Sequence, residues 1–120
     1  MAWRLDHVQL AIPEGAEARC DEFYVDLLGF APLEKPPLLA ARGGRWYRRD
    51  GVTLHLGVEA DFRPARKAHP ALTVDGYDEL LARLTARGVA VRPDDSIPGT
   101  TRCHVNDPVG NRLELIEGSP

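Results

Sequence analysis

The chain has 120 residues, of which 43% are hydrophobic and 28% charged, and this is typical of one globular domain with its own core. A net charge of −3 argues against general nucleic-acid binding, and no apolar run approaches the ~20 residues of a membrane span. The N-terminus shows no signal-peptide pattern. We therefore predict a cytoplasmic protein whose two cysteines, Cys20 and Cys103, are reduced thiols.

The first segment predicts a strand followed by a helix. Residues 3–12 alternate, so that Val8, Leu10 and Ile12 share one face while Leu5, His7 and Gln9 share the other. Pro13 ends this strand. An apolar stripe over 15–28 predicts a helix, and Gly29 suits the left-handed position that closes a helix.

The next segment predicts a hairpin. Three prolines between residues 30 and 39 leave at most a short edge strand and a loop. Residues 45–58 read as two strands that turn at Asp50 and Gly51, a strong two-residue turn signal. This register pairs Trp46 with His55. One face of the hairpin then carries Trp46, Arg48, Thr53 and His55, and the aliphatic residues take the other face.

A polar, proline-containing stretch at residues 59–68 separates the two halves of the chain. The second half begins with a strand over 69–74, in which His69 lies on the face opposite the aliphatic residues. A helix over about 75–87 follows. A short strand at 89–91 and a loop at 93–98 complete this part of the prediction.

The last hairpin turns at Asp107-Pro-Val-Gly-Asn, because proline fixes φ and glycine and asparagine tolerate positive φ. Its strands are predicted over 100–106 and from Arg112 onward. If Cys103 shares the aliphatic face with Leu113 and Leu115, then His104 pairs with Glu114, whereas a slip of one residue would put Cys103 in its place. The apolar pattern favours His104.

Three landmarks repeat along the chain in the same order. Residues 51–56 match 110–115 at an offset of 59, and residues 6–12 match 68–74 at an offset of 62. Both predicted helices end at a glycine, again 59 residues apart. We therefore expect a single domain over 1–120 that consists of module one at about 1–58, a linker at about 59–68 and module two at about 69–120.

Four predicted strands each carry one ionisable residue on the face away from their aliphatic residues: His7, His55, His69 and Glu114. The helices must cover the aliphatic faces, so the other faces must line a shared concavity. Three imidazoles and one carboxylate suit a divalent ion such as Zn, Fe(II), Mn, Ni or Co. The alternatives are structural or surface histidines and a solvated Glu114.

The same faces supply candidate substrate-binding residues. Trp46 offers an aromatic surface and Arg48 can pair with an anionic group, with Gln9 and Arg102 on the corresponding faces of their own strands. The alternatives are that Trp46 is a packing residue and that the arginines belong to a solvated strand.

Several of these stretches resemble the vicinal oxygen chelate superfamily, which includes glyoxalase I, bleomycin-resistance proteins, fosfomycin-resistance enzymes and extradiol dioxygenases. The resemblance rests on Leu5-Asp-His-Val, the Leu54-His-Leu strand, His69, and Asp107-Pro-Val-Gly-Asn-Arg-Leu-Glu114. It covers nearly the whole chain. It implies an α+β fold of two tandem βαβββ modules that form a cupped mixed sheet with the helices outside, usually in a homodimer.

The resemblance also implies site residues. Metal-dependent members take their ligands from the first and fourth strands of each module, which correspond here to His7, His55, His69 and Glu114. Fosfomycin enzymes carry a tyrosine ten residues before the glutamate, where this chain has His104. Typical bacterial glyoxalase I has glutamate in place of His55, and this difference argues against the methylglyoxal–glutathione reaction.

We therefore hypothesise a small cytoplasmic metalloenzyme of the lyase, isomerase or dioxygenase type. Its metal would chelate a bidentate oxygen substrate and stabilise an oxyanion. Glu114 is the candidate base, and His104 is the alternative proton carrier. The competing hypothesis is a protein like the bleomycin-resistance proteins, which sequesters a small molecule without catalysis. The expected partners are a small-molecule substrate and a second copy of the chain.

Overall fold

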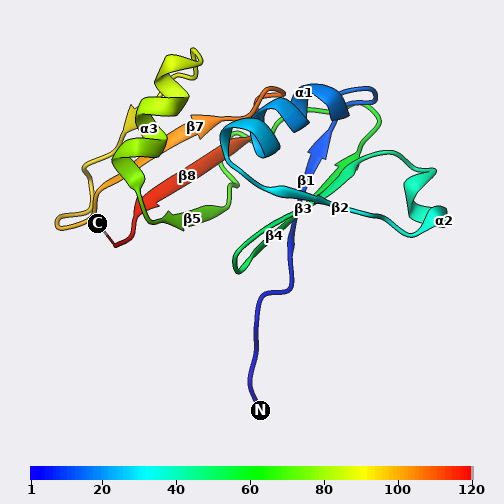
Figure 1. Ribbon diagram of the computed structural model, residues 1–120, viewed down its shortest axis with the longest axis horizontal. Coiled ribbons are helices and arrows are strands. Elements are labelled where there is room, and N and C mark those ends of the chain that lie inside the picture. The colour runs from blue at the N-terminus through cyan, green and yellow to red at the C-terminus, as the bar shows by residue number, and fades with distance from the viewer. Residues whose placement is uncertain (120) are drawn as a thin grey trace. The chain divides into compact units, whose positions relative to one another are not determined.

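The computed structural model describes residues 1–119, and the chain forms two compact units that divide between Pro64 and Ala65 (Figure 1). Unit 1 consists of β1 (Val8–Ile12), α1 (Glu17–Asp21), its π-helical continuation η1 (Glu22–Leu27), β2 (Ala31–Leu33), α2 (Pro37–Ala40), β3 (Arg45–Arg49) and β4 (Val52–Val58). Unit 2 consists of β5 (Ala71–Val74), α3 (Tyr77–Ala86), β6 (Arg92–Pro93), β7 (Arg102–Asn106) and β8 (Arg112–Glu117). No helix of the described residues is long and apolar enough to cross a membrane.

The two units have the same sheet topology. Each has a four-stranded mixed sheet, with the order β1-β4-β3-β2 in unit 1 and β5-β8-β7-β6 in unit 2. In each unit the first strand runs parallel to the fourth, and the other neighbours are antiparallel. The predicted α+β class is confirmed, and the repeated strand order is the structural counterpart of the repeat in the sequence.

The core of unit 1 lies between its sheet and the helical segment α1–η1. Tyr47, Leu54 and Leu56 project from β3 and β4 and are almost fully buried. The ring of Tyr24 in η1 stacks on that of Tyr47 at 5.3 Å, and the Tyr47 hydroxyl donates a 2.6 Å hydrogen bond to Asp21. Since side chains alternate along a strand, the residues next to these three in the sequence lie on the opposite face of the sheet.

The core of unit 2 is built in the same way from α3 and its sheet. Figure 1 shows α3 alongside β7 and β8. The buried side chains of this core are Tyr77, Leu84, Cys103, Val105, Leu113 and Leu115. The predicted register is confirmed, because His104 pairs with Glu114 and Cys103 with Leu115. Glu114 and His104 consequently lie on the face of the sheet away from α3.

A buried carboxylate organises the turn between β7 and β8. Oδ1 of Asp107 accepts hydrogen bonds from the backbone N–H groups of Val109 at 3.0 Å and Asn111 at 2.8 Å. Oδ2 accepts a third bond from the Asn111 side chain at 3.1 Å, and both residues are only 5% exposed. Gly110 takes a φ of 94°, which explains the glycine. The turn fixes which residues of β7 and β8 face each other.

Four predicted elements differ from the structure. The first strand begins at Val8 rather than at residue 3, because β4 begins at Val52 and leaves the earliest residues without a neighbouring strand in unit 1. The strand predicted over 69–74 begins at Ala71, since Pro70 has no N–H for a ladder. The loop after β2 contains the short helix α2, and the short strand predicted at 89–91 is instead β6.

Candidate metal and ligand site

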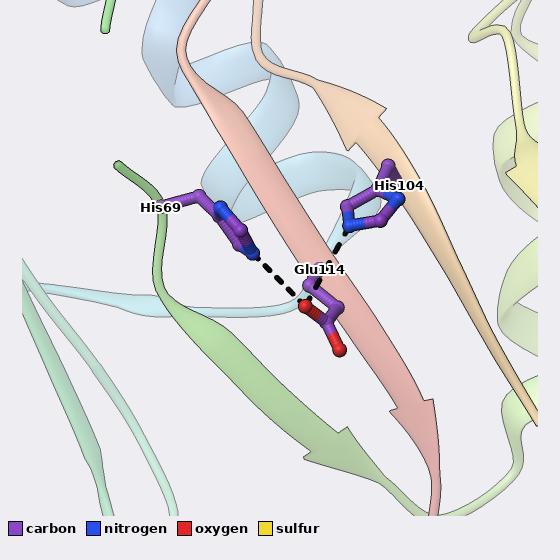
Figure 2. Close-up of side chains that lie close together, drawn as sticks. All are labelled: His69, His104 and Glu114. Atoms are coloured by element: carbon purple, nitrogen blue, oxygen red, sulfur yellow. Dashed lines mark hydrogen bonds and ion pairs between the residues drawn. The ribbon is translucent and has the colours of Figure 1, made fainter. Parts of the chain in front are cut away.

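Unit 2 brings two imidazoles to one carboxylate. Glu114 stands in the middle of β8 and is only 7% exposed, so its charge requires partners. His104 lies directly opposite it on β7, and Ala71 of β5 lies on its other side. His69 lies two residues before Ala71, just outside β5. Figure 2 shows both imidazole rings pointing at the Glu114 carboxylate.

The donor atoms of this cluster have the spacing of metal ligands. Nε2 of His69 is 2.9 Å from Oε1 of Glu114, and Nε2 of His104 is 3.6 Å from the same oxygen. The three residues offer donor atoms that all lie within 4.8 Å of one another. Two donors about 2.1 Å from one tetrahedral ion are roughly 3.4 Å apart. The two distances to Oε1 of Glu114 lie on either side of this value, so each histidine and Glu114 are close to the spacing of two ligands of one ion.

The second oxygen of Glu114 is occupied by a cation of the chain. Nη1 of Arg102 donates to Oε2 at 3.0 Å, while its Nη2 contacts Oδ2 of Asp94 at 3.0 Å and Oγ of Ser96 at 2.8 Å. The Arg102 side chain is only 12% exposed. The structure therefore places this predicted substrate residue in an internal ion-pair network. The contacts leave Oε1 as the carboxylate oxygen that faces the histidines.

The same contacts keep Glu114 ionised. The hydrogen bond from His69 lowers the pKa of Glu114 most. The hydrogen bond and the charge of Arg102, and the electrostatic attraction of His104, lower it further. Desolvation of the carboxylate acts in the opposite direction but does not prevail. Glu114 therefore offers an anionic oxygen at neutral pH, as a metal ligand must.

Acceptors lie beside Nδ1 of both imidazoles, at hydrogen-bond distance for His69 and beyond it for His104. The backbone carbonyl of Lys67 lies 2.7 Å from Nδ1 of His69, and because a carbonyl only accepts, this nitrogen carries a hydrogen. The other nitrogen, Nε2, then faces Glu114. On His104, Nδ1 lies 3.8 Å from Oδ2 of Asp94 and Nε2 again faces Glu114. Carbonyl and carboxylate partners of this kind typically orient metal-ligating histidines.

Unit 1 places the other two predicted imidazoles in an aromatic stack. The ring of His55 on β4 stacks on that of His7 with centroids 4.0 Å apart and planes at 20°. It also stacks on Trp46 of β3 at 4.3 Å and 7°, as the cross-strand pairing of these residues requires. Desolvation of the His55 ring, followed by electrostatic repulsion from His7, lowers the pKa of His55. Nδ1 of His7 lies 2.8 Å from Oδ2 of Asp6.

The stack restricts how these rings can bind metal. A nitrogen lone pair lies in the plane of its imidazole, so a bound ion must lie close to that plane. The planes of His7 and His55 are nearly parallel and 4.0 Å apart at their centroids, and such planes meet only far from both rings. In this arrangement the two histidines do not both bind the same ion. Gln9 and Arg48, two predicted substrate residues, line a groove beside the stack.

Asp94, Ser96 and Asp6 are site residues that the sequence analysis missed. Asp94 and Ser96 lie in a loop where no periodic pattern assigns side chains to a face. A local signal does exist, because Asp94 accepts bonds from the backbone and hydroxyl of Ser96 in an Asp-x-Ser turn. Asp6 directly precedes His7 in the sequence. This position next to the histidine could have indicated a carboxylate that orients the imidazole.

Comparison with known proteins gives consistent matches to one family. Residues 4–115 match the Glyoxalase/Bleomycin resistance protein/Dioxygenase superfamily. A glyoxalase family protein from Bacillus anthracis is 39% identical, with a TM-score of 0.94 over 99% of this chain and 98% of that chain. The antibiotic-binding protein TnmS3 from Streptomyces sp. CB03234 is 27% identical, with a TM-score of 0.70 over 98% of this chain and 100% of that chain.

A more distant structure shares the fold. The fosfomycin resistance protein FosX from Listeria monocytogenes is 15% identical, with a TM-score of 0.78 over 99% of this chain and 96% of that chain. No curated protein sequence matches the chain. The family match spans both units and includes the first predicted ligand, His7, as well as the last, Glu114. The chain is therefore a member of the glyoxalase/bleomycin resistance protein/dioxygenase superfamily.

Proposed function

We propose that the chain is a metal-dependent enzyme that acts on a small molecule with two neighbouring oxygen donors. One observation carries this proposal: Oε1 of a buried, ionised Glu114 faces Nε2 of both His69 and His104 at 2.9 and 3.6 Å. A nearly buried carboxylate beside two oriented imidazoles is a donor set that fits Zn, Fe(II), Mn, Ni or Co.

We propose His69 and Glu114 as the metal ligands of unit 2. The predicted set takes its other imidazoles, His7 and His55, from unit 1. Of these two, His7 is the better candidate, because Asp6 lies beside its Nδ1 and leaves Nε2 to bind a metal. The stacked arrangement lets only one of the pair join a given ion. His104 is either a third ligand or the proton carrier of the site.

The reaction would use the acid–base pair of unit 2. When bound, a divalent ion supplies Lewis-acid stabilisation of a developing oxyanion. Glu114 Oε1 and His104 Nε2 lie 3.6 Å apart, so a proton taken up by one can pass to the other after a small movement. Arg102 holds the far oxygen of Glu114 and so keeps Oε1 directed at the histidines. Lyase, isomerase and dioxygenase chemistry all fit this arrangement.

Metal content tests the proposal directly. We expect protein purified without added metal, stripped with a chelator and dialysed against Co²⁺ or Zn²⁺, to retain about one ion per chain. Elemental analysis measures this content, and the visible spectrum of the Co²⁺ form reports nitrogen and oxygen ligation. Replacing His69 with Ala should remove most of the binding. Retention of less than a tenth of an equivalent by the wild type would overturn the proposal.

The second candidate function is sequestration of a small molecule without catalysis. The observation in its favour is the 27% identity to an antibiotic-binding protein over nearly the whole length of both chains. A binding protein of this kind needs no ion, so its ligand affinity should be the same with and without a chelator. An enzyme of the proposed kind should lose turnover when the ion is removed.

We also propose a homodimer, which the family resemblance implies. To test whether sites are shared, His7→Ala and Glu114→Ala chains are mixed and allowed to exchange. If each site combines residues of two chains, half of the dimers are mixed and each has one intact site, so metal content should return to about a quarter of wild type. If each site lies in one chain, mixing restores nothing. A monomer in light scattering at micromolar concentration would contradict the dimer.

A further inference from the structure

A groove of about 670 Å³ runs beside the aromatic stack of unit 1. It is bordered by β1, β3 and β4 and by the loop that contains α2. Its lining includes Asp6, His7, Trp46 and Thr53. The volume lies within the ~300–1,000 Å³ that is usual for small-molecule sites. All of its lining residues belong to unit 1, so the groove contains none of the proposed metal ligands of unit 2.

The charge of the groove is opposite to that of the whole chain. Three cations line it, Lys35, Arg42 and Arg48, against one carboxylate, Asp6. Asp6 already lies 2.8 Å from Nδ1 of His7, which reduces its effect on a ligand. The chain as a whole has a net charge of −3. The groove is therefore a local positive region on an acidic protein, and such a region concentrates anions.

Arg48 is positioned to meet an anionic group. Its Nε donates to Oγ1 of Thr53, its cross-strand partner, at 3.3 Å. This bond uses Nε, so the two terminal amino groups of the guanidinium remain available as donors. A planar fork of this kind suits a carboxylate, because it donates two parallel hydrogen bonds.

The stacked rings supply a second, independent requirement. Because His55 stacks on Trp46 at 7° and on His7 at 20°, the three rings face one another and turn their edges outward. The edges of aromatic rings carry partial positive charge and attract the negative face of another ring. Leu33 and Leu39 of the same lining add apolar surface. A flat aromatic molecule is more complementary to this surface of ring edges and leucine side chains than a compact polar molecule is.

We infer that the groove of unit 1 binds a planar aromatic acid, whose anionic group pairs with Arg48 and whose ring lies across the edges of the Trp46–His55–His7 stack. The inference deepens the proposed function, because it names the class of substrate. The binding that it proposes uses only side chains of the protein and does not depend on a metal ion. It is therefore tested in the presence of a chelator, and its failure and that of the metal proposal are distinguishable.

The test follows the indole N–H signal of Trp46 by NMR. The chain has two tryptophans, so a Trp3→Phe background leaves Trp46 as the only indole. The probes share a ring and differ in charge: 4-methylbenzoate, 4-methylbenzyl alcohol and 4-methylbenzylammonium. We expect 4-methylbenzoate to shift the signal saturably in EDTA and to bind at least about tenfold more tightly than the other two, with weaker binding at high salt.

Two variants separate the groove from general attraction. Arg48→Gln should weaken binding of 4-methylbenzoate by about tenfold. Arg19 is an exposed residue of α1 outside the groove, so Arg19→Gln should leave this binding within about twofold. Equal binding of the alcohol and the acid, an unmoved Trp46 signal, or binding that requires added metal would each overturn the inference. If the acid binds as expected but the chain fails to retain Co²⁺ or Zn²⁺ in the separate metal-content test, the metal proposal alone is overturned.

Discussion

Replacing Glu114 with Gln removes most of the divalent-metal affinity, and we expect the Kd for Zn²⁺ or Co²⁺ to rise by at least about 100-fold. The amide has nearly the shape of the carboxylate but no charge. It has one acceptor oxygen, which Arg102 Nη1 attracts, so its NH₂ group turns toward His69 and His104. Competition with a chelating dye measures the affinity of the variant and the wild type.

The matched control is Glu117→Gln at the end of the same strand. Glu117 is exposed and pairs with Val74, beyond the cluster, so we expect its metal affinity to stay within about twofold of wild type. Circular dichroism of both variants shows that the sheet is intact. Equal metal affinity in the Glu114 variant, the Glu117 variant and the wild type would contradict the assignment of Glu114.

Replacing Asp107 with Ala should cause the largest loss of stability among polar substitutions in unit 2. The variant leaves two backbone N–H groups of a buried turn without the oxygen that accepts from them. Hydrogen bonds to a charged acceptor contribute about 1.5–3 kcal/mol each, so we expect the free energy of unfolding to fall by about 3 kcal/mol. Urea denaturation followed by circular dichroism measures this loss.

Asp95→Ala is the control for this substitution. Asp95 is an exposed aspartate in the loop before β7, and its removal should change the free energy of unfolding by less than about 0.5 kcal/mol. The Asp107 variant should also bind metal more weakly, because the turn sets the pairing of His104 with Glu114. An Asp107 variant as stable as the Asp95 variant would show that the turn holds without its carboxylate.

The sequence predicted the register of the site because the alternation along the two strands agreed with the turn that joins them. Alternation placed Glu114 and His104 on the face opposite Leu113 and Cys103, and the turn residues from Asp107 to Asn111 fixed the loop length between the strands. In unit 1 the Asp50–Gly51 turn similarly predicted the pairing of Trp46 with His55. The alternation of apolar and polar residues along a strand can be read from a few consecutive residues, so short segments are enough to predict which face each side chain takes.

The partners of Arg102 did not follow from periodicity. Asp94 and Ser96 lie in a loop, and their contacts with Arg102 depend on the path of that loop over the sheet. Likewise, alternation placed His7 and His55 on one face but did not fix the rotation of their rings. The stacking of those rings results from side-chain rotamers, which pack against neighbours on adjacent strands and have no sequence period.

The repeated strand order gives each unit an equivalent cross-strand pair, Trp46 with His55 on β3 and β4, and His104 with Glu114 on β7 and β8. The same place in the two sheets thus holds two different chemistries: a pair of stacked rings in unit 1, and a carboxylate beside an imidazole in unit 2. The double substitution Trp46→His and His55→Glu would give the first half the pair of the second.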